Sequence, residues 1–250
     1  MTRLMSVEFA PLQFEPTYRK VATALLERIV DRTLANGARL PAELELARQF
    51  GVNRSTVREA MRELESAGMV RRQRGSKLMM VSRPEREAVA DGVSRALALH
   101  DVSIRNVWEG LSILEPSIAE VAAKRRLAAD LRAIEATVAQ ALQRDPDRAA
   151  LQAADFFRHL GEATHNRVLM LAHEPLLQLL VPSLRTIIDE VAVARMRIAT
   201  AQRKICDAIR DGDANESRIW TERHIRDYRR GFGLAGIDLQ NRVAAKPQSD

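Results

Sequence analysis

The chain has 250 residues, of which 46% are hydrophobic and 29% charged, and its formal net charge is +6 at neutral pH. This length and apolar content predict two domains, each with a hydrophobic core. The single cysteine, Cys206, excludes an intrachain disulfide and fits a reducing cytoplasm, and no stretch is apolar enough to predict a membrane span or a signal-peptide core.

A short helix is predicted between Pro41 and Gly51. Pro41 restricts φ where the helix would begin, and Glu43 and Glu45 place negative charge in the first turn, where the helix dipole favours it. Gly51 would end the helix in the left-handed conformation that glycine tolerates. Three apolar side chains are expected to pack from this helix: Leu44, Ala47 and Phe50.

A second helix is predicted from about residue 53 to Gly68. Asn53 and Ser55 are residue types that cap helices. An apolar stripe at helical spacing follows them: Val57, Ala60, Met61 and Leu64. The first turn and outer face carry small polar and basic side chains: Asn53, Arg54, Ser55, Thr56, Arg58 and Arg62. Such side chains at a helix N-terminus suit the base edges and phosphates of DNA.

Two strands are predicted after this helix, over residues 69–73 and 78–81. They flank a basic tip made of Arg74, Gly75, Ser76 and Lys77. Two helices followed by such a hairpin have the layout of a winged helix-turn-helix, whose second helix fits the major groove while the wing reaches the backbone or the minor groove.

The distribution of charge separates two interpretations of this surface. Residues 1–82 hold 14 Lys and Arg against 9 Asp and Glu, whereas residues 83–250 hold 25 against 24. Within residues 53–77 there are seven basic residues and three acidic ones. An ordinary solvated face does not explain this concentration, but a polyanion-binding end joined to a nearly neutral body does. We therefore predict that this segment binds DNA.

Residues 17–81 resemble the DNA-binding domain of GntR-family transcriptional regulators. The resemblance includes a helix expected over residues 18–34 and the lead-in NGARLP at 36–41. It implies DNA contacts from the start of the recognition helix and from the wing. The DNA-binding residues predicted there are Asn53, Arg54, Ser55, Thr56, Arg58, Arg74, Gly75 and Lys77. Leu44 stands where relatives often carry a base-reading arginine, so the usual operator sequence does not carry over.

The rest of the chain is predicted to be helical, because Ala, Leu, Arg and Glu dominate it and period-two runs are absent. Breakers near residues 100–101, 124–126, 145–146, 165–166, 181–182 and 211–213 divide it into six or seven helices. The predicted fold class is mainly α: an N-terminal winged helix-turn-helix with a small β-hairpin wing, then a C-terminal all-α helical bundle. The predicted parts are an extension (1–16), the DNA-binding domain (17–82), a linker (83–87), the bundle (88–236) and a polar tail (237–250).

The bundle resembles the FCD ligand-sensing domain of the FadR-type subgroup. The matching residues are 114–116 with Ala119, Ala122 and Ala123; Asp155, His159, Glu162, Ala163 and Asn166; Ile205, Ala208, Ile209 and Asp213; and His224. The resemblance implies dimerisation and a small effector that changes DNA affinity. The FCD pattern uses one Asp and three His, and by motif position these are Asp155, His159 and His224, with Gln202 in place of the middle histidine. Leu111 stands where relatives commonly carry an arginine for a ligand carboxylate.

Asp155 and His159 are four residues apart, so they are expected on one face of a helix, where they could chelate Zn²⁺, Mn²⁺ or Ni²⁺. The candidate metal ligands are Asp155, His159 and His224, and the predicted effector pocket adds Leu111 and Gln202. Three interpretations stay open: a divalent metal completed by Gln202 or water, a metal-free pocket for a less acidic or more apolar ligand, and a vestigial site of satisfied polar residues. His173 is expected near a helix boundary without a special role.

These observations predict a cytoplasmic transcriptional regulator, more specifically a repressor, that is not an enzyme. Its predicted partners are a double-stranded DNA operator, a small-molecule effector and a second copy of the chain. A rival interpretation is a helical-bundle metalloenzyme using Asp155, His159 and His224, but no further motif supplies an acid or base and the basic module stays unexplained. A sequence-indifferent architectural DNA binder would leave the polar interior of the bundle unexplained.

Overall fold

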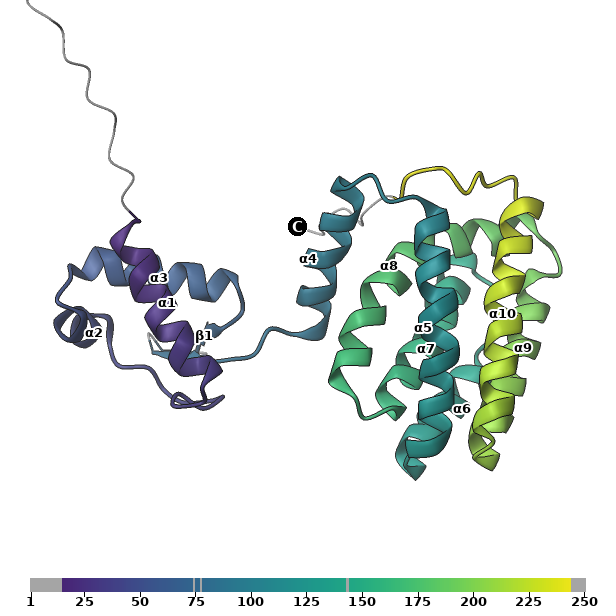
Figure 1. Cartoon of the computed structure of the whole chain (residues 1–250), viewed down its shortest axis with the longest axis horizontal. Helices are drawn as coiled ribbons and strands as arrows, with labels where there is room; N and C mark the ends of the chain where they lie inside the picture. The colour runs from purple at the N-terminus through teal and green to yellow at the C-terminus, as the bar shows by residue number, and fades with distance from the viewer. Residues whose placement is uncertain (1–14, 74, 77, 143, 244–250) are drawn as a thin grey trace, which may run out of the picture. The chain divides into compact units, whose positions relative to one another are not determined.

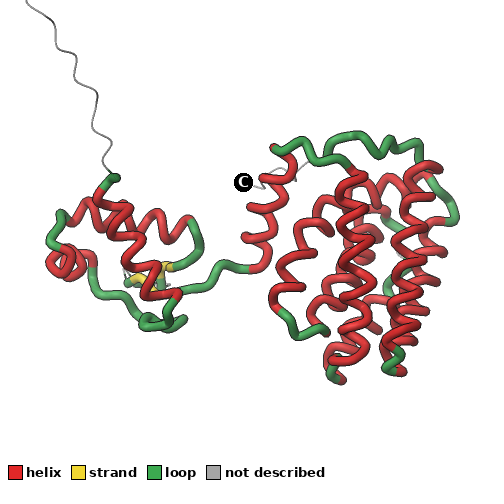
Figure 2. Tube along the Cα trace, viewed as in Figure 1, coloured by secondary structure: helices red, strands yellow, loops and turns green. Residues whose placement is uncertain are grey.

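The computed structural model describes residues 15–73, 75–76, 78–142 and 144–243. The chain divides into two compact units, with the boundary between Glu85 and Arg86. Both units are mainly helical (Figures 1 and 2). Two residues predicted to bind DNA from the wing tip, Arg74 and Lys77, lie outside the described residues, as does most of the predicted extension at 1–16.

The N-terminal unit contains three helices and one hairpin in the order expected of a winged helix-turn-helix. Its elements are α1 (Thr17–Val30), α2 (Glu43–Phe50), α3 (Arg54–Ser66), β1 (Val70–Arg72) and β2 (Met79–Val81). The strands pair antiparallel with Val70 opposite Val81, and α3 packs against both α1 and α2. The predicted fold of this unit is therefore confirmed.

The core of the N-terminal unit agrees with the predicted stripe of α3 but differs at α2. Val57, Ala60, Met61 and Leu64 are all buried. On α2 the buried side chains are Leu46 and Ala47, whereas Leu44 is 57% exposed, so its predicted packing role is wrong. Leu44 precedes Leu46 by two positions, about 200° around a helix, and so points away from α3. Gly51 ends α2 with a φ of 63°, as expected.

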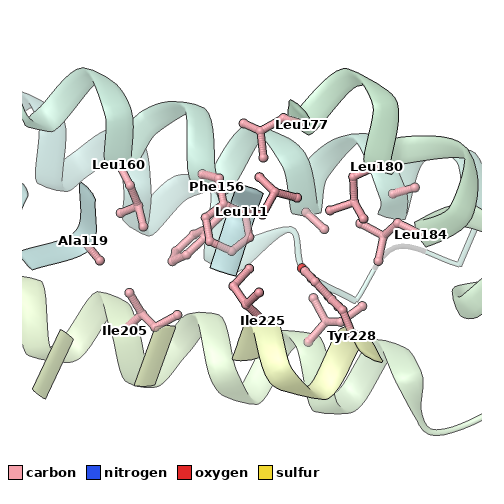
Figure 3. Close-up of a cluster of buried hydrophobic side chains, with 14 of the residues drawn as sticks. Leu111, Ala119, Phe156, Leu160, Leu177, Leu180, Leu184, Ile205, Ile225 and Tyr228 are labelled. Carbon is pink, nitrogen blue, oxygen red and sulfur yellow. The ribbon is translucent and has the colours of Figure 1, made fainter. Parts of the chain in front are cut away.

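The C-terminal unit contains seven helices within the part of the chain that the structure describes. They are α4 (Arg86–Leu99), α5 (Ile104–Arg125), α6 (Ala128–Ala139), α7 (Pro146–Ala163), α8 (Arg167–Glu190), α9 (Ala194–Asp211) and α10 (Ala214–Leu234). The central helix is α5, which packs against α7, α8, α9 and α10, while α4 lies on α8. Figure 3 shows the apolar side chains that meet in this core, among them Leu111 of α5 and Phe156 of α7. The bundle prediction is confirmed.

One predicted helix boundary is wrong. The sequence predicted a break at residues 181–182, but α8 continues from Arg167 to Glu190 with Pro175 and Pro182 inside it. Each proline removes one helical hydrogen bond, and burial of Leu177, Leu180 and Leu184 along the same helix outweighs that loss. The break falls later, between α8 and α9.

The predicted polar tail starts too early. Leu239 and Asn241 accept backbone hydrogen bonds from Arg105 and Ile104 (both 2.9 Å), and Val243 donates one to Val102 (2.9 Å). This segment therefore satisfies amides at the start of α5 that have no partner inside the helix. In the described part of the chain, no helix combines the length and hydropathy that crossing a membrane requires.

Candidate functional site

The start of α3 presents a polar, basic surface opposite its buried stripe. Asn53 takes the N-cap position with extended backbone, and Arg54, Ser55 and Arg58 are exposed, while Thr56 is half-buried. On the wing, Gly75 is exposed with a φ of 73°. The predicted DNA-contacting residues that the structure describes thus lie on the recognition helix and the wing.

A carboxylate of α2 holds two of these arginines. Glu43 Oε2 accepts hydrogen bonds from Arg54 Nε (3.0 Å) and Arg58 Nη2 (3.3 Å). Burial alone would raise the pKa of Glu43, but the two guanidinium groups outweigh it and hold the pKa below its ordinary value. Both arginine side chains stay largely exposed, so Glu43 orients them without covering them.

Asp155 and His159 share a face of α7, as predicted, but this face is turned away from the bundle's interior. The Asp155 carboxylate is half exposed and pairs with Arg158. His159 Nδ1 lies 3.0 Å from Glu162 Oε2, and its ring is also partly exposed. Gln202 and His224 have other partners: Gln202 bonds to the Ala153 carbonyl, and His224 stacks on Phe157 and meets the Tyr228 hydroxyl.

The interior face of α7 carries Ala153 and Phe157 instead. Gln202 of α9 donates from Nε2 to the Ala153 carbonyl (3.3 Å). The Phe157 ring stacks on the His224 ring of α10, with centroids 5.7 Å apart and planes 12° from parallel. The Tyr228 hydroxyl completes the cluster at 3.0 Å from His224 Nε2. All of these residues are buried.

The predicted metal ligands are therefore not brought together. Among the described residues, no three His, Cys, Asp or Glu side chains form a group that could hold a metal ion. The face turned toward His224 offers a methyl group and a phenyl ring, which cannot ligate a metal, so the residues present do not fit the FCD metal set. The metalloenzyme alternative required the same three side chains to hold an ion, so it is not supported either. A signal was available in the sequence: the apolar positions 149, 150, 153, 156, 157 and 160 recur at helical spacing and leave out 155 and 159.

The rest of the predicted effector pocket is also buried. Leu111 and Gln202 are 0% exposed, and Leu111 is part of the hydrophobic core. Gln202 Oε1 also accepts from Gln152 Nε2 (3.2 Å), which in turn donates to the Thr137 carbonyl (2.8 Å). The amide pair ties α6, α7 and α9 together, so Gln202 is satisfied by the protein itself.

A buried acid–base pair was not predicted. Glu115 Oε1 lies 3.0 Å from His173 Nδ1, and both side chains are almost fully buried. Burial raises the pKa of Glu115, and the nearby His173 only partly offsets this. The assignment of His173 to a helix boundary is wrong, because α8 runs unbroken through it. A carboxylate within the apolar stripe of α5 was the only hint in the sequence.

An ionic network extends from this pair to the beginning of α4. Arg158 Nε donates to Glu174 Oε1 (2.6 Å), next to His173 in the chain. Arg86, the first residue of α4, donates to Glu162 Oε1 (2.7 Å) and lies 3.7 Å from Glu174 Oε2. These contacts hold α4, α7 and α8 together at the end of the bundle where the chain enters it.

His224 makes the stability of the bundle depend on pH. Burial lowers its pKa from 6.5 to about 4, because the buried site disfavours the imidazolium, although Asp227 acts in the opposite direction. The unfolded chain therefore takes up this proton first. The contribution of neutral His224 to stability is complete above about pH 6.5 and is lost as the pH falls toward about 4.

We expect His224 alone to lower the free energy of unfolding by about 2 kcal/mol between about pH 7.5 and about pH 5. Urea unfolding at both pH values measures this, with His224→Phe as the control that cannot titrate. Other groups, Glu115 included, titrate in both proteins and cancel. Equal losses of stability in the two proteins would contradict the prediction.

A groove opens on the surface between α9 and α10. It encloses about 540 Å³, and its walls include Val193, Met196, Thr200, Trp220, Arg223 and His224. Arg223 lies over the Trp220 ring at 5.0 Å, and Arg197 donates from Nε to Asp227 Oδ2 (2.7 Å). Of the predicted effector residues, only His224 contributes to this groove.

Comparison with known proteins decides the family. Residues 17–78 match the gntR family of bacterial regulatory proteins, and residues 107–227 match the FCD domain. Over 170 residues the chain is 32% identical to an HTH-type transcriptional regulator of Mycobacterium tuberculosis, a match that covers 66% of this chain and 69% of the relative. The chain belongs to the GntR family. It is a DNA-binding transcriptional regulator whose C-terminal FCD domain is a ligand-sensing domain.

Other relatives of this GntR regulator are named as repressors. The galactonate operon transcriptional repressor of Escherichia coli is 29% identical, with 81% of this chain and 91% of the relative covered. The repressor NanR of Cronobacter sakazakii is 28% identical, with 86% and 85% covered. Among solved structures, a GntR protein of Streptococcus agalactiae has a TM-score of 0.59 and 25% identity, covering 85% of this chain and 99% of its own.

Proposed function

We propose that this GntR regulator represses transcription as a homodimer on an operator with two half-sites, and that a small molecule bound by its C-terminal unit changes its affinity for that operator. The observation that carries the proposal is the exposed start of α3, where Glu43 holds Arg54 and Arg58 in place. Pre-oriented guanidinium groups are suited to paired hydrogen bonds with guanine in the major groove. The relatives that are named as repressors support repression rather than activation.

The groove between α9 and α10 is our candidate for the effector site. Its volume of about 540 Å³ lies in the range of small-molecule sites, which are mostly apolar with a few polar groups. Val193 and Met196 are exposed apolar side chains on one wall, and Trp220 with Arg223 forms another. We infer a ligand with an apolar body and a polar or anionic group that approaches Arg223.

Binding in this groove has a route to the DNA-binding function. A ligand changes the regulator's operator affinity only if it binds two arrangements of the protein unequally. The groove includes His224, whose partners Phe157 and Tyr228 lie in the core. A ligand that displaces His224 would therefore act on the packing of α7 against α10.

The test uses the full chain and duplex fragments that tile the region upstream of its own gene. We expect one fragment to bind about 1000-fold more tightly than an unrelated duplex of the same length at physiological salt. Its footprint should show two half-sites about one helical turn apart, and light scattering should report a dimer. Equal affinity for all fragments would contradict sequence-specific regulation, and a monomer at micromolar concentration would contradict the dimer.

A thermal-shift screen of metabolites then tests the effector. We expect a compound that raises the melting temperature to release the operator fragment as well. Trp220→Ala should abolish both responses if the compound occupies the groove, while leaving operator affinity without the compound unchanged. An unchanged thermal shift in this variant would place the effector elsewhere.

A further inference from the structure

We infer that the sensor domain of this protein works without a metal ion. The α7 positions that face Gln202 and His224 are two residues before the Asp155 and His159 assigned from the motif, and they hold Ala153 and Phe157, which leaves His224 as the only imidazole of the set. This inference rests on the family assignment and on the buried geometry around His224. It does not depend on the identity of the operator or the effector.

Only one face of α7 is turned toward His224. Two ligands four residues apart on α7 can reach a metal beside His224 only from the face that α7 turns toward α9 and α10. The stacking of Phe157 on His224 identifies that face, and Ala153, four residues earlier, lies on it too. Gln202 of α9 contacts the backbone carbonyl of Ala153. Asp155 and His159 follow by two positions, about 200° around the helix, and their side chains are engaged with Arg158 and Glu162.

The side chains around His224 offer too few ligands for a metal ion. A tightly held divalent transition metal takes at least three N, O or S ligands from the protein. Ala153 and Phe157 provide none, and His224 Nε2 already lies 3.0 Å from the Tyr228 hydroxyl, while the Phe157 ring covers one face of the imidazole. The amide of Gln202 is already bonded to Ala153 and Gln152 at its two ends.

Packing and hydrogen bonds made by side chains stand where an ion would otherwise link the helices. The phenyl ring and the two glutamines connect α6, α7, α9 and α10 by packing and hydrogen bonds. Three of these helices, α7, α9 and α10, are the ones that a shared ion would otherwise hold together. The centre of the domain is thus closed by side chains alone, and its folding should not be linked to divalent metal.

The first experiment measures metal in the full chain purified without chelators. We expect less than about 0.1 equivalent of Zn, Mn and Ni per chain by mass spectrometry, and a melting temperature that changes by less than about 1 °C with added metal or with EDTA. About one equivalent of tightly held metal that is lost in His224→Ala would overturn the inference. Asp155→Asn combined with His159→Ala is the matched control, since it removes the exposed pair that could bind metal adventitiously.

The second experiment restores the ligand set. In the triple variant Ala153→Asp, Phe157→His and Gln202→His, these side chains and His224 form one Asp and three His, and Zn²⁺ or Mn²⁺ should raise its melting temperature by more than about 5 °C. A folded triple variant without this shift would overturn the positional assignment. If the triple variant does not fold, Phe157→His with Gln202→His, which keeps Ala153 and groups three imidazoles, serves the same purpose. Operator binding by the wild type is measured in parallel, so that a failure of the proposed regulatory function can be told apart from a failure of the metal-free inference.

Discussion

Replacing Gly161 with alanine is expected to destabilise the C-terminal unit by about 2–4 kcal/mol, although alanine normally favours a helix over glycine. A Cβ atom at position 161 would lie 2.4 Å from His173 Nε2 and 2.7 Å from His173 Cε1. The ring cannot turn away freely, because its Nδ1 is bonded to the buried Glu115. Moving His173 would leave a buried carboxylate without its partner.

Urea unfolding followed by tryptophan fluorescence measures this loss, since both tryptophans of the chain, Trp108 and Trp220, lie in the C-terminal unit. Gly92→Ala in α4 is the matched control: nothing lies within 4 Å of its new Cβ, so it should gain up to about 1 kcal/mol. The double variant with His173→Ala should lose less stability than the sum of the losses in the two single variants. A Gly161→Ala protein as stable as the wild type would refute the clash.

Arg54→Ala or Arg58→Ala is expected to weaken binding to the preferred duplex by about 10- to 100-fold while leaving folding intact. Both side chains are held by Glu43 at 3.0 and 3.3 Å and remain largely exposed. Their loss removes pre-oriented donors from the start of the recognition helix but no part of the core. Electrophoretic mobility or anisotropy titration measures the change.

The salt dependence of binding separates two roles for these arginines. A base-reading arginine changes the ratio of specific to unspecific affinity, whereas a phosphate contact lowers both affinities and reduces the salt slope by about one. Arg203→Ala, an exposed position on α9, removes the same charge from the other unit and is the control. Loss of binding in the control equal to that in Arg54→Ala would mean that net charge alone matters.

The N-terminal unit could be predicted in detail because its signals are local. The apolar stripe of α3, the helix end at Gly51 and the strands around the wing depend on residues a few positions apart. Leu44 was the exception, since its exposure depends on where α3 lies. Within the C-terminal unit, the break predicted at residues 145–146 is also a local signal: Asp145 caps α7, and its side chain accepts from the Asp147 amide (2.9 Å).

The sequence by itself determined which residues share a helix face, because that follows from 3.6 residues per turn. Asp155 and His159 do share one. Which face turns inward was decided only by the tertiary structure, where α7 directs Ala153 and Phe157 toward Gln202 and His224. The pairing of Glu115 with His173, 58 residues apart, was decided in the same way. Contacts between distant segments depend on how whole helices pack, and no short spacing encodes the rotation of one helix against another.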